Sequence, residues 1–200
     1  MQPVLVFDLG KVLVDFDYSI AARKIAARSA KSSAELGAFL LRSPLLADYE
    51  SGRLTRPQFY DAIRDAIGFH GDLDEFGGYF ADIFTAMPET IDLHAEVRRR
   101  GYQTYLLSNT NDLAVEHVRR NFPFYKDFDG YVLSYEVGVM KPESKIYAAM
   151  ETLTGRRGAD LVYIDDRPEN VEAGVARGWR GIVHESAEKT RRALAAWGVV

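Results

Sequence analysis

Residues 4–13 read VLVFDLGKVL, and this stretch decides the fold class of the chain. The four apolar residues before Asp8 are typical of a strand that is buried on both faces, as in a parallel sheet. Further apolar runs follow at residues 102–107, 130–133, 161–164 and 181–183. Helical patterns lie between these runs, at residues 89–100, 111–121, 142–154 and 168–177. Because alternating strands and helices form crossover connections, the sequence predicts an α/β fold with a doubly wound parallel sheet.

Three of the expected helices are marked by a proline that precedes a glutamate, namely Pro88, Pro142 and Pro168. Proline loses no hydrogen bond at the first helical position, and an acid in the first turn meets the positive end of the helix dipole. We therefore expect helices to begin at these prolines.

Residues 18–86 interrupt the alternation. They read as successive helices at residues 18–30, 33–42, 44–51, 56–67 and 73–85. In the fourth, Phe59, Ile63 and Ile67 recur at the spacing of one helix face. The sequence thus predicts an α/β core made of residues 1–17 and 87–200, and an inserted all-helical domain made of residues 18–86.

Composition excludes several classes of protein. With 25 Lys and Arg against 29 Asp and Glu in 200 residues, the chain lacks the basic surface that nucleic-acid binding requires. It has no cysteine, which rules out disulfides, cysteine–zinc sites and thiol nucleophiles, and fits a reducing cytoplasm. The N-terminal apolar run is too short for a signal peptide or a membrane span. We therefore expect a cytoplasmic protein with no nucleic-acid or membrane partner.

Polar residues gather where the predicted strands end or where the following helices begin. The clusters are Asp8, Ser108-Asn109-Thr110, Lys141 and Asp165-Asp166. Taken singly, each has an ordinary explanation as a turn, a helix cap or a surface residue. However, open α/β sheets bind ligands at the carboxyl ends of their strands, so we expect the clusters to converge.

Together these residue types suit phosphate chemistry. Converging carboxylates repel one another unless a cation lies between them, and Mg²⁺ binds a few carboxylates together with a substrate phosphate. A hydroxyl, an amide and an ammonium group supply donors for phosphate oxygens. An aspartate can also attack phosphorus, because carboxylates form aspartyl-phosphate intermediates.

The order and spacing of these segments resemble the haloacid dehalogenase-like superfamily over nearly the whole chain. The motifs that carry the resemblance are VLVFDLGKVL (4–13), LLSNT (106–110), GVMKP (138–142) and YIDDRPEN (163–170). The helical insert after the first motif resembles the cap of subfamily IA. The sequences of the motifs are most similar to those of the sugar-phosphate phosphatase branch, near the phosphatase domain of epoxide hydrolases.

The resemblance implies a role for each site residue. Asp8 would be the nucleophile and a magnesium ligand, together with the backbone carbonyl of Gly10. Asp166 would bind the metal directly, and Asp165 would reach it through water. Ser108 and Asn109 would hold phosphate oxygens, Lys141 would neutralise Asp8 and the phosphoryl group, and Asn170 would orient a neighbour.

The implied function is that of a Mg²⁺-dependent phosphatase. It would hydrolyse small phosphorylated metabolites, with sugar phosphates as one candidate class, through an aspartyl-phosphate intermediate. The expected partner is a small-molecule phosphate ester, and the expected state is a monomer or a homodimer.

One position departs from the family pattern. Most phosphatases of this family carry an acid–base aspartate two residues after the nucleophile, and here that residue is Gly10, which cannot transfer a proton. Positioned proton transfer contributes roughly 10²–10⁴-fold to the rate. We therefore predict slow turnover or substrates with good leaving groups, such as anomeric sugar phosphates or acyl phosphates, unless Asp15, Asp17 or a cap residue supplies the proton.

Three other functions share part of this residue pattern. A dehalogenase-type hydrolase of the same fold would use Asp8 to displace halide without a metal, although the doubled aspartate favours metal and phosphate. A phosphate-binding member that has lost catalysis is compatible with Gly10. A phospho-acceptor receiver domain is disfavoured, because its acidic pair follows the first strand and it has no helical insert.

Overall fold

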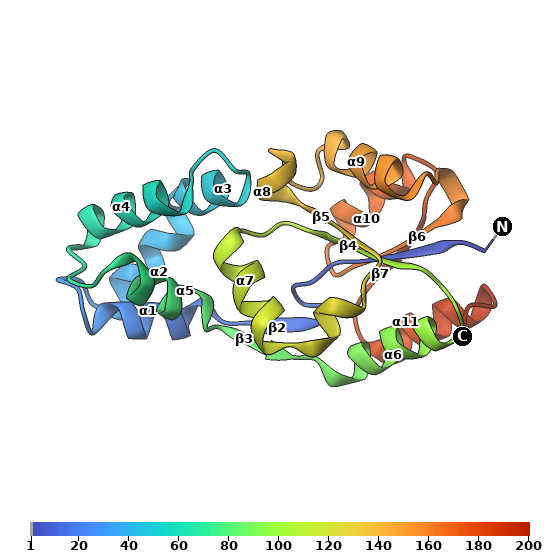
Figure 1. Ribbon diagram of the computed structural model, residues 1–200, viewed down its shortest axis with the longest axis horizontal. Coiled ribbons are helices and arrows are strands. Elements are labelled where there is room, and N and C mark those ends of the chain that lie inside the picture. Colours follow the sequence, from blue (N-terminus) through green and yellow to red (C-terminus); the bar gives the residue numbers. More distant parts are fainter. Residues whose placement is uncertain (1) are drawn as a thin grey trace.

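The computed structural model describes residues 2–200 and has a five-stranded sheet at its centre (Figure 1). The strands are β1 (Val4–Phe7), β4 (Thr104–Ser108), β5 (Gly130–Leu133), β6 (Leu161–Asp165) and β7 (Arg180–Val183). Their order is β5-β4-β1-β6-β7, and every neighbouring pair is parallel. Since the chain extends the sheet on both sides of β1, the doubly wound α/β fold predicted from the sequence is confirmed.

Alternate side chains of β1 face two different layers of helices. Leu5 and Phe7 belong to one apolar cluster, and Val4 and Val6 belong to another. This alternation follows from the pleat of a strand, whose successive side chains point to opposite faces. The first cluster includes residues of α6 (Pro88–Arg99), α7 (Asp112–Asn121) and α11 (Ala187–Ala196), and the second residues of α9 (Ser144–Thr154). Helix α10 (Pro168–Val175) contacts β6 and β7.

Two of the three helix starts predicted from prolines are confirmed, because α6 begins at Pro88 and α10 begins at Pro168. The third is wrong. Glu143 has an extended backbone as the N-cap of α9, so this helix begins at Ser144 and Pro142 lies in the preceding turn. Helix α11 and the shorter helices α8 (Ser134–Val137), η1 (Pro123–Asp127) and η2 (Gly158–Asp160) were not predicted from the sequence.

The inserted segment folds into helices that share one apolar cluster, to which the core contributes Leu113 of α7. They are α1 (Tyr18–Ala26), α2 (Ser33–Arg42), α3 (Leu45–Glu50), α4 (Arg56–Ile67) and α5 (Leu73–Ala81). Phe59, Phe76 and Phe80 are almost completely buried at the centre of this cluster. Ring stacking and edge contacts of this kind add to the stabilisation that burial provides. Because nearly all of the buried members of this cluster come from residues 18–86, it supports our proposal that these residues form a cap, divided from the core at 17/18 and 86/87.

A short antiparallel ribbon joins the cap to the core. It consists of β2 (Val14–Phe16) and β3 (Phe84–Ala86), which the sequence analysis did not predict. The helix expected at 73–85 ends at Ala81, because Asp82 has a non-helical backbone and β3 pairs with β2. The helix expected at 18–30 likewise ends early, at Ala26.

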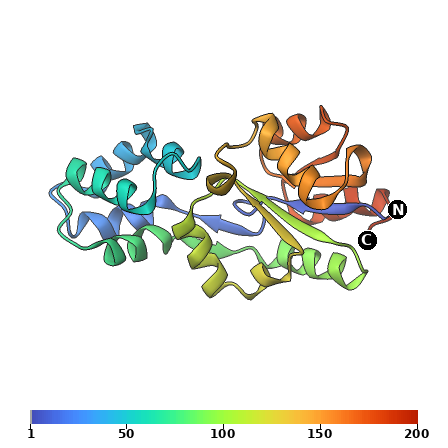
Figure 2. The ribbon, with the colours of Figure 1, turned by 45° about the horizontal axis from the view of Figure 1, so that its top comes forward.

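The cap lies beyond the end of β1 from which the chain enters the ribbon (Figure 2). The start of β1 and the C-terminus lie towards the opposite end of the molecule (Figure 1). The carboxyl ends of the strands therefore face the cap. Within residues 2–200, none of the helices has the length and apolar content that a membrane span requires.

Candidate active site

A buried lysine links two aspartates at the carboxyl ends of β1 and β6. The Nζ atom of Lys141 lies 2.9 Å from Oδ1 of Asp8 and 2.7 Å from Oδ2 of Asp165. It also donates a hydrogen bond of 3.0 Å to the carbonyl oxygen of Leu107. An ammonium group has three N–H donors, and here each has an acceptor. The structure thus brings together three residues that the sequence places far apart.

Burial and mutual charge set the ionisation of this group. Burial raises the pKa of Asp8 to about 7, although the Lys141 ammonium opposes the rise. Burial would lower the pKa of Lys141, but the carboxylates of Asp8 and Asp165 raise it on balance. For Asp165, the nearby ammonium outweighs burial, so its pKa lies below the usual value. Lys141 is therefore a cation and Asp165 an anion at neutral pH.

Asp165 is completely buried and held by several donors. Its oxygens accept hydrogen bonds from Tyr163 Oη at 2.5 Å, from the backbone N–H of Arg167 at 2.9 Å and from Asn170 Nδ2 at 3.0 Å, in addition to Lys141. Asn170 thus orients its acidic neighbour, in agreement with the role that the resemblance implies. A carboxylate bound in this way holds Lys141 in place.

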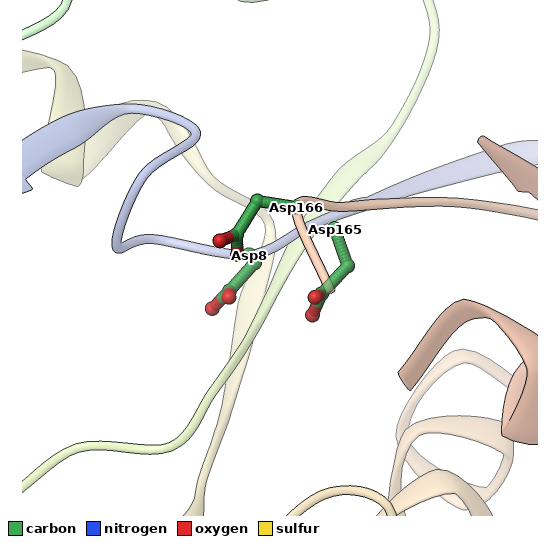
Figure 3. A group of neighbouring side chains, drawn as sticks. All are labelled: Asp8, Asp165 and Asp166. Carbon is green, nitrogen blue, oxygen red and sulfur yellow. The ribbon is translucent and has the colours of Figure 1, made fainter. Parts of the chain in front are cut away.

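Three carboxylates at this edge of the sheet are arranged so that they can hold a cation. Asp8, Asp165 and Asp166 each offer an oxygen, and these atoms all lie within 4.8 Å of one another (Figure 3). Burial and the neighbouring Asp165 carboxylate raise the pKa of Asp166. A divalent cation removes this repulsion, and an all-oxygen donor set suits Mg²⁺. The residues present therefore fit the metal that the sequence predicts.

Gly10 follows Asp8 by two residues, in the turn between β1 and β2. The N–H of Val14 bonds to the carbonyl of Leu9, and the N–H of Lys11 bonds to the carbonyl of Val14. The Gly10 carbonyl takes part in neither bond. Gly10 also lines a cavity of about 60 Å³ between the core and the cap.

Ser108 and Asn109 lie at the end of β4 and line the same cavity. The Ser108 hydroxyl makes one long contact of 3.5 Å, to the carbonyl of Asn109. The Asn109 side chain accepts a hydrogen bond from the N–H of Lys141 at 2.7 Å and donates one to its carbonyl at 3.1 Å. The Asn109 amide therefore holds the backbone of Lys141 through its oxygen and one N–H, and its second N–H is available to another acceptor.

Residues 3–178 match the family model of the haloacid dehalogenase-like hydrolases. The chain belongs to this family. The receiver-domain alternative is therefore wrong, and the expectation that the chain is a hydrolase with this fold is confirmed.

Named relatives of this hydrolase include two phosphatases. A D-ribitol-5-phosphate phosphatase of Bacteroides thetaiotaomicron is 24% identical over 95% of both chains. A sesquiterpene phosphatase of Aspergillus oryzae is 23% identical over 88% of this chain and 87% of its own. A solved haloacid dehalogenase family enzyme of B. thetaiotaomicron, in complex with magnesium and inorganic phosphate, superimposes with a TM-score of 0.81. It is 26% identical, over 92% of this chain and 95% of its own.

In this hydrolase, the space beside Gly10 is occupied. A Cβ atom at Gly10 would lie 2.9 Å from Cε1 of Phe16, so an aspartate there would displace the ring. The two candidates near this position have other partners. Asp15 is exposed and pairs with Lys11, and Asp17 accepts hydrogen bonds from the backbone and hydroxyl of Ser19 at the start of α1.

The structure places Glu50, an acidic residue that was not named from the sequence, at the cavity that Gly10 lines. Glu50, the last residue of α3, lines the 60 Å³ cavity together with Gly10 and Ser108. It also lines a second cavity, of about 760 Å³, within the cap. Because Gly10 stands where most phosphatases of this family carry an acid–base aspartate, the sequence indicated that another residue could supply the proton. Which residue is placed to do so depends on how the cap docks, and the sequence does not show this.

Proposed function

We propose that the protein is a Mg²⁺-dependent phosphatase that hydrolyses small phosphate monoesters through an aspartyl-phosphate intermediate. The observation that carries this proposal is the buried cluster of Asp8, Lys141 and Asp165, with Asp166 beside it. A nucleophilic carboxylate, a fixed cation and a set of oxygen ligands meet at one point. The phosphatase relatives support the same activity.

Each core residue has a role in this proposal. An oxygen of Asp8 attacks phosphorus in line, and the bond to the leaving oxygen breaks as the new P–O bond forms. The Lys141 ammonium neutralises the negative charge that gathers on Asp8 and on the phosphoryl group. The Ser108 hydroxyl and the remaining N–H of Asn109 donate to phosphate oxygens. Water then attacks the aspartyl phosphate and restores Asp8.

The metal would be held by Asp8, Asp166 and the carbonyl of Gly10. The oxygens of Asp165 already accept bonds from Lys141 and Asn170, so we assign Asp165 to an indirect position, through water. When bound, Mg²⁺ supplies positive charge beside the phosphate.

The cap cavity is where we place the organic part of the substrate. Its volume of about 760 Å³ lies within the range typical of small-molecule sites. Ala22, Leu40 and Leu46 form apolar parts of its wall, and Ser19 and Arg23 add polar groups. This mixed lining suits a phosphorylated metabolite with both carbon surface and hydroxyl groups, so sugar phosphates remain one candidate class.

The proposed function is tested by assaying phosphate release from a panel of phosphate esters, with Mg²⁺ and with EDTA. We expect release that depends on Mg²⁺ and that falls about 10⁴-fold or more in Asp8→Asn, because the nucleophile is lost while the shape is kept. Halide release from 2-haloacids without a metal would instead support the dehalogenase alternative. Phosphate binding without turnover in the wild type would support a member that has lost catalysis.

A further inference from the structure

Glu50 lies where the two cavities share a wall. Tyr18 is the other residue that lines both the 60 Å³ cavity and the 760 Å³ cavity. A phosphate ester bound with its phosphate beside Ser108 and its organic group in the cap would pass between these two residues. The bond that breaks in hydrolysis joins these two parts of the substrate, so a side chain at this junction is placed to reach the leaving oxygen.

The backbone of Glu50 is fixed to the core. Its carbonyl oxygen accepts a hydrogen bond of 2.5 Å from the hydroxyl of Ser134, which is completely buried. The same hydroxyl accepts a hydrogen bond of 2.9 Å from the N–H of Thr110. Thr110 directly follows Ser108 and Asn109 in the chain. Glu50 is therefore positioned relative to the proposed phosphate site by a single intervening side chain.

Residues on both sides of Glu50 strengthen this attachment. The hydroxyl of Tyr49 donates to the carboxylate of Asp112 at the start of α7. Gly52 has φ of +69°, and a Cβ atom there would lie 2.3 Å from the carbonyl oxygen of Tyr135. Such close backbone approach is open only to glycine. The end of α3 thus lies against the core.

The surroundings of Glu50 favour a proton on its carboxyl group. Burial raises its pKa to about 7, and the negative charge of Asp8 adds to the rise. Tyr18 faces it from α1, and Asp17 and Arg23 line the same cap cavity. Burial raises the pKa of the Tyr18 hydroxyl far above neutrality, so tyrosine is the weaker proton donor of the pair.

We propose that Glu50 is the general acid and base of this hydrolase and replaces the aspartate that is absent at Gly10. The inference rests on the proposed phosphatase function. In the first step, Asp8 forms a bond to phosphorus, the bond from phosphorus to the leaving oxygen breaks, and the Glu50 proton passes to that oxygen. In the second step, the Glu50 carboxylate takes a proton from water as the water oxygen bonds to phosphorus. The bond from phosphorus to Asp8 then breaks, and both carboxyl groups return to their starting states.

The test is Glu50→Gln, which keeps the shape of the side chain and the backbone carbonyl that Ser134 holds. An alkyl phosphate has a poor leaving group, so its kcat/KM should fall roughly 10²–10⁴-fold. p-Nitrophenyl phosphate needs no proton on its leaving group, so its kcat/KM should fall less than about tenfold. Because the second step lacks its base, the variant should release a burst of one nitrophenolate per active site and then turn over slowly.

Two controls accompany this variant. Asp74→Asn removes an exposed carboxylate from α5 of the same cap and should change neither ester's kinetics. Asp8→Asn should show no burst, because no aspartyl phosphate forms.

Three results would overturn the role of Glu50. They are an equal loss on both esters, no loss on either, or a wild-type enzyme that hydrolyses aryl but not alkyl phosphates. A wild type with no phosphatase activity on any ester would count against the proposed function itself.

Discussion

The core and the cap hold their functional groups in different ways. In the core, Asp8, Lys141 and Asp165 come from separate segments, are at most 8% exposed and are fixed by bonds to one another. In the cap, Glu50 is partly buried and is held by its backbone, while its side chain lines two cavities. The core thus fixes the positions of its charged side chains by their mutual bonds, whereas the position of the Glu50 carboxyl group depends on how the cap docks.

Within the core, His94 should make folding sensitive to acid. This histidine is 1% exposed, stacks on Phe128 and bonds to the hydroxyl of Thr104. Burial, helped by the positive charge of Arg98, lowers its pKa from 6.5 to about 4. The unfolded chain therefore takes up a proton at a higher pH than the folded protein does. The stability from neutral His94 is fully present above pH 6.5 and is lost as the pH falls towards 4.

We expect this loss to be about 3 kcal/mol of unfolding free energy between pH 7 and pH 4. The raised pKa of Asp8 changes stability in the opposite direction over this range, so the His94 contribution is the difference between the wild type and His94→Gln in urea unfolding at both pH values. On going from pH 7 to pH 4, the wild type should lose more unfolding free energy than the variant, because glutamine does not titrate. An equal fall in both proteins would contradict the assignment to His94.

Two arginines of α4 lie on different sides of the cap, one facing the core and one facing away from it. Arg56 bonds to Asp112 at 2.7 Å and to Glu116 at 2.8 Å, both on α7 of the core. Arg64 pairs with Asp61 and Asp65 of its own helix. Arg56→Ala should lower the unfolding free energy by roughly 1 kcal/mol and raise KM several-fold, because it loosens the docking. Arg64→Ala should change neither quantity measurably.

Thermal unfolding measures the change in stability of each variant, and steady-state kinetics measures the change in KM. Equal effects of the two substitutions would show that the contacts to α7 do not control the position of the cap.

The smallest expected effect concerns Gly37, which lines the cap cavity and has no atom within 4 Å of a Cβ built on it. Gly37→Ala should raise the unfolding free energy by about 0.5–1 kcal/mol, because alanine favours helix and restricts the unfolded chain. Gly37→Phe should instead fill part of the cavity and lower kcat/KM for esters of large alcohols, with little change for small ones. Calorimetry and kinetics check both effects, and equal losses on large and small esters would place the substrate elsewhere.

The core could be predicted from the sequence because its signals are local. Val4–Phe7 and Leu161–Ile164 are apolar on both faces, and the polar residues that follow them fall at one edge of the sheet in any parallel arrangement. Asp8 and Asp165 lie at strand ends and Lys141 precedes the next helix, so the sequence predicted that the three residues lie close together.

The parts that were missed depend on tertiary contacts. The strands β2 and β3 have only three residues each, and their pairing closes a loop of more than sixty residues, which no local pattern indicates. Glu50 looks like an ordinary surface residue at the end of a short helix. Its proximity to Asp8 depends on the Ser134 hydroxyl and on the close approach at Gly52, which only the folded cap shows.

The Ser134 hydroxyl has a single hydrogen atom but two carbonyl oxygens within reach, that of Glu50 at 2.5 Å and that of Thr110 at 3.1 Å. It can donate to one of them at a time. A change in the spacing between residues 108–110 and the end of α3 would therefore change which of the two carbonyl oxygens accepts the hydrogen bond. One buried oxygen atom is thus the shared hydrogen-bond partner of the segment after β4 and of the end of α3.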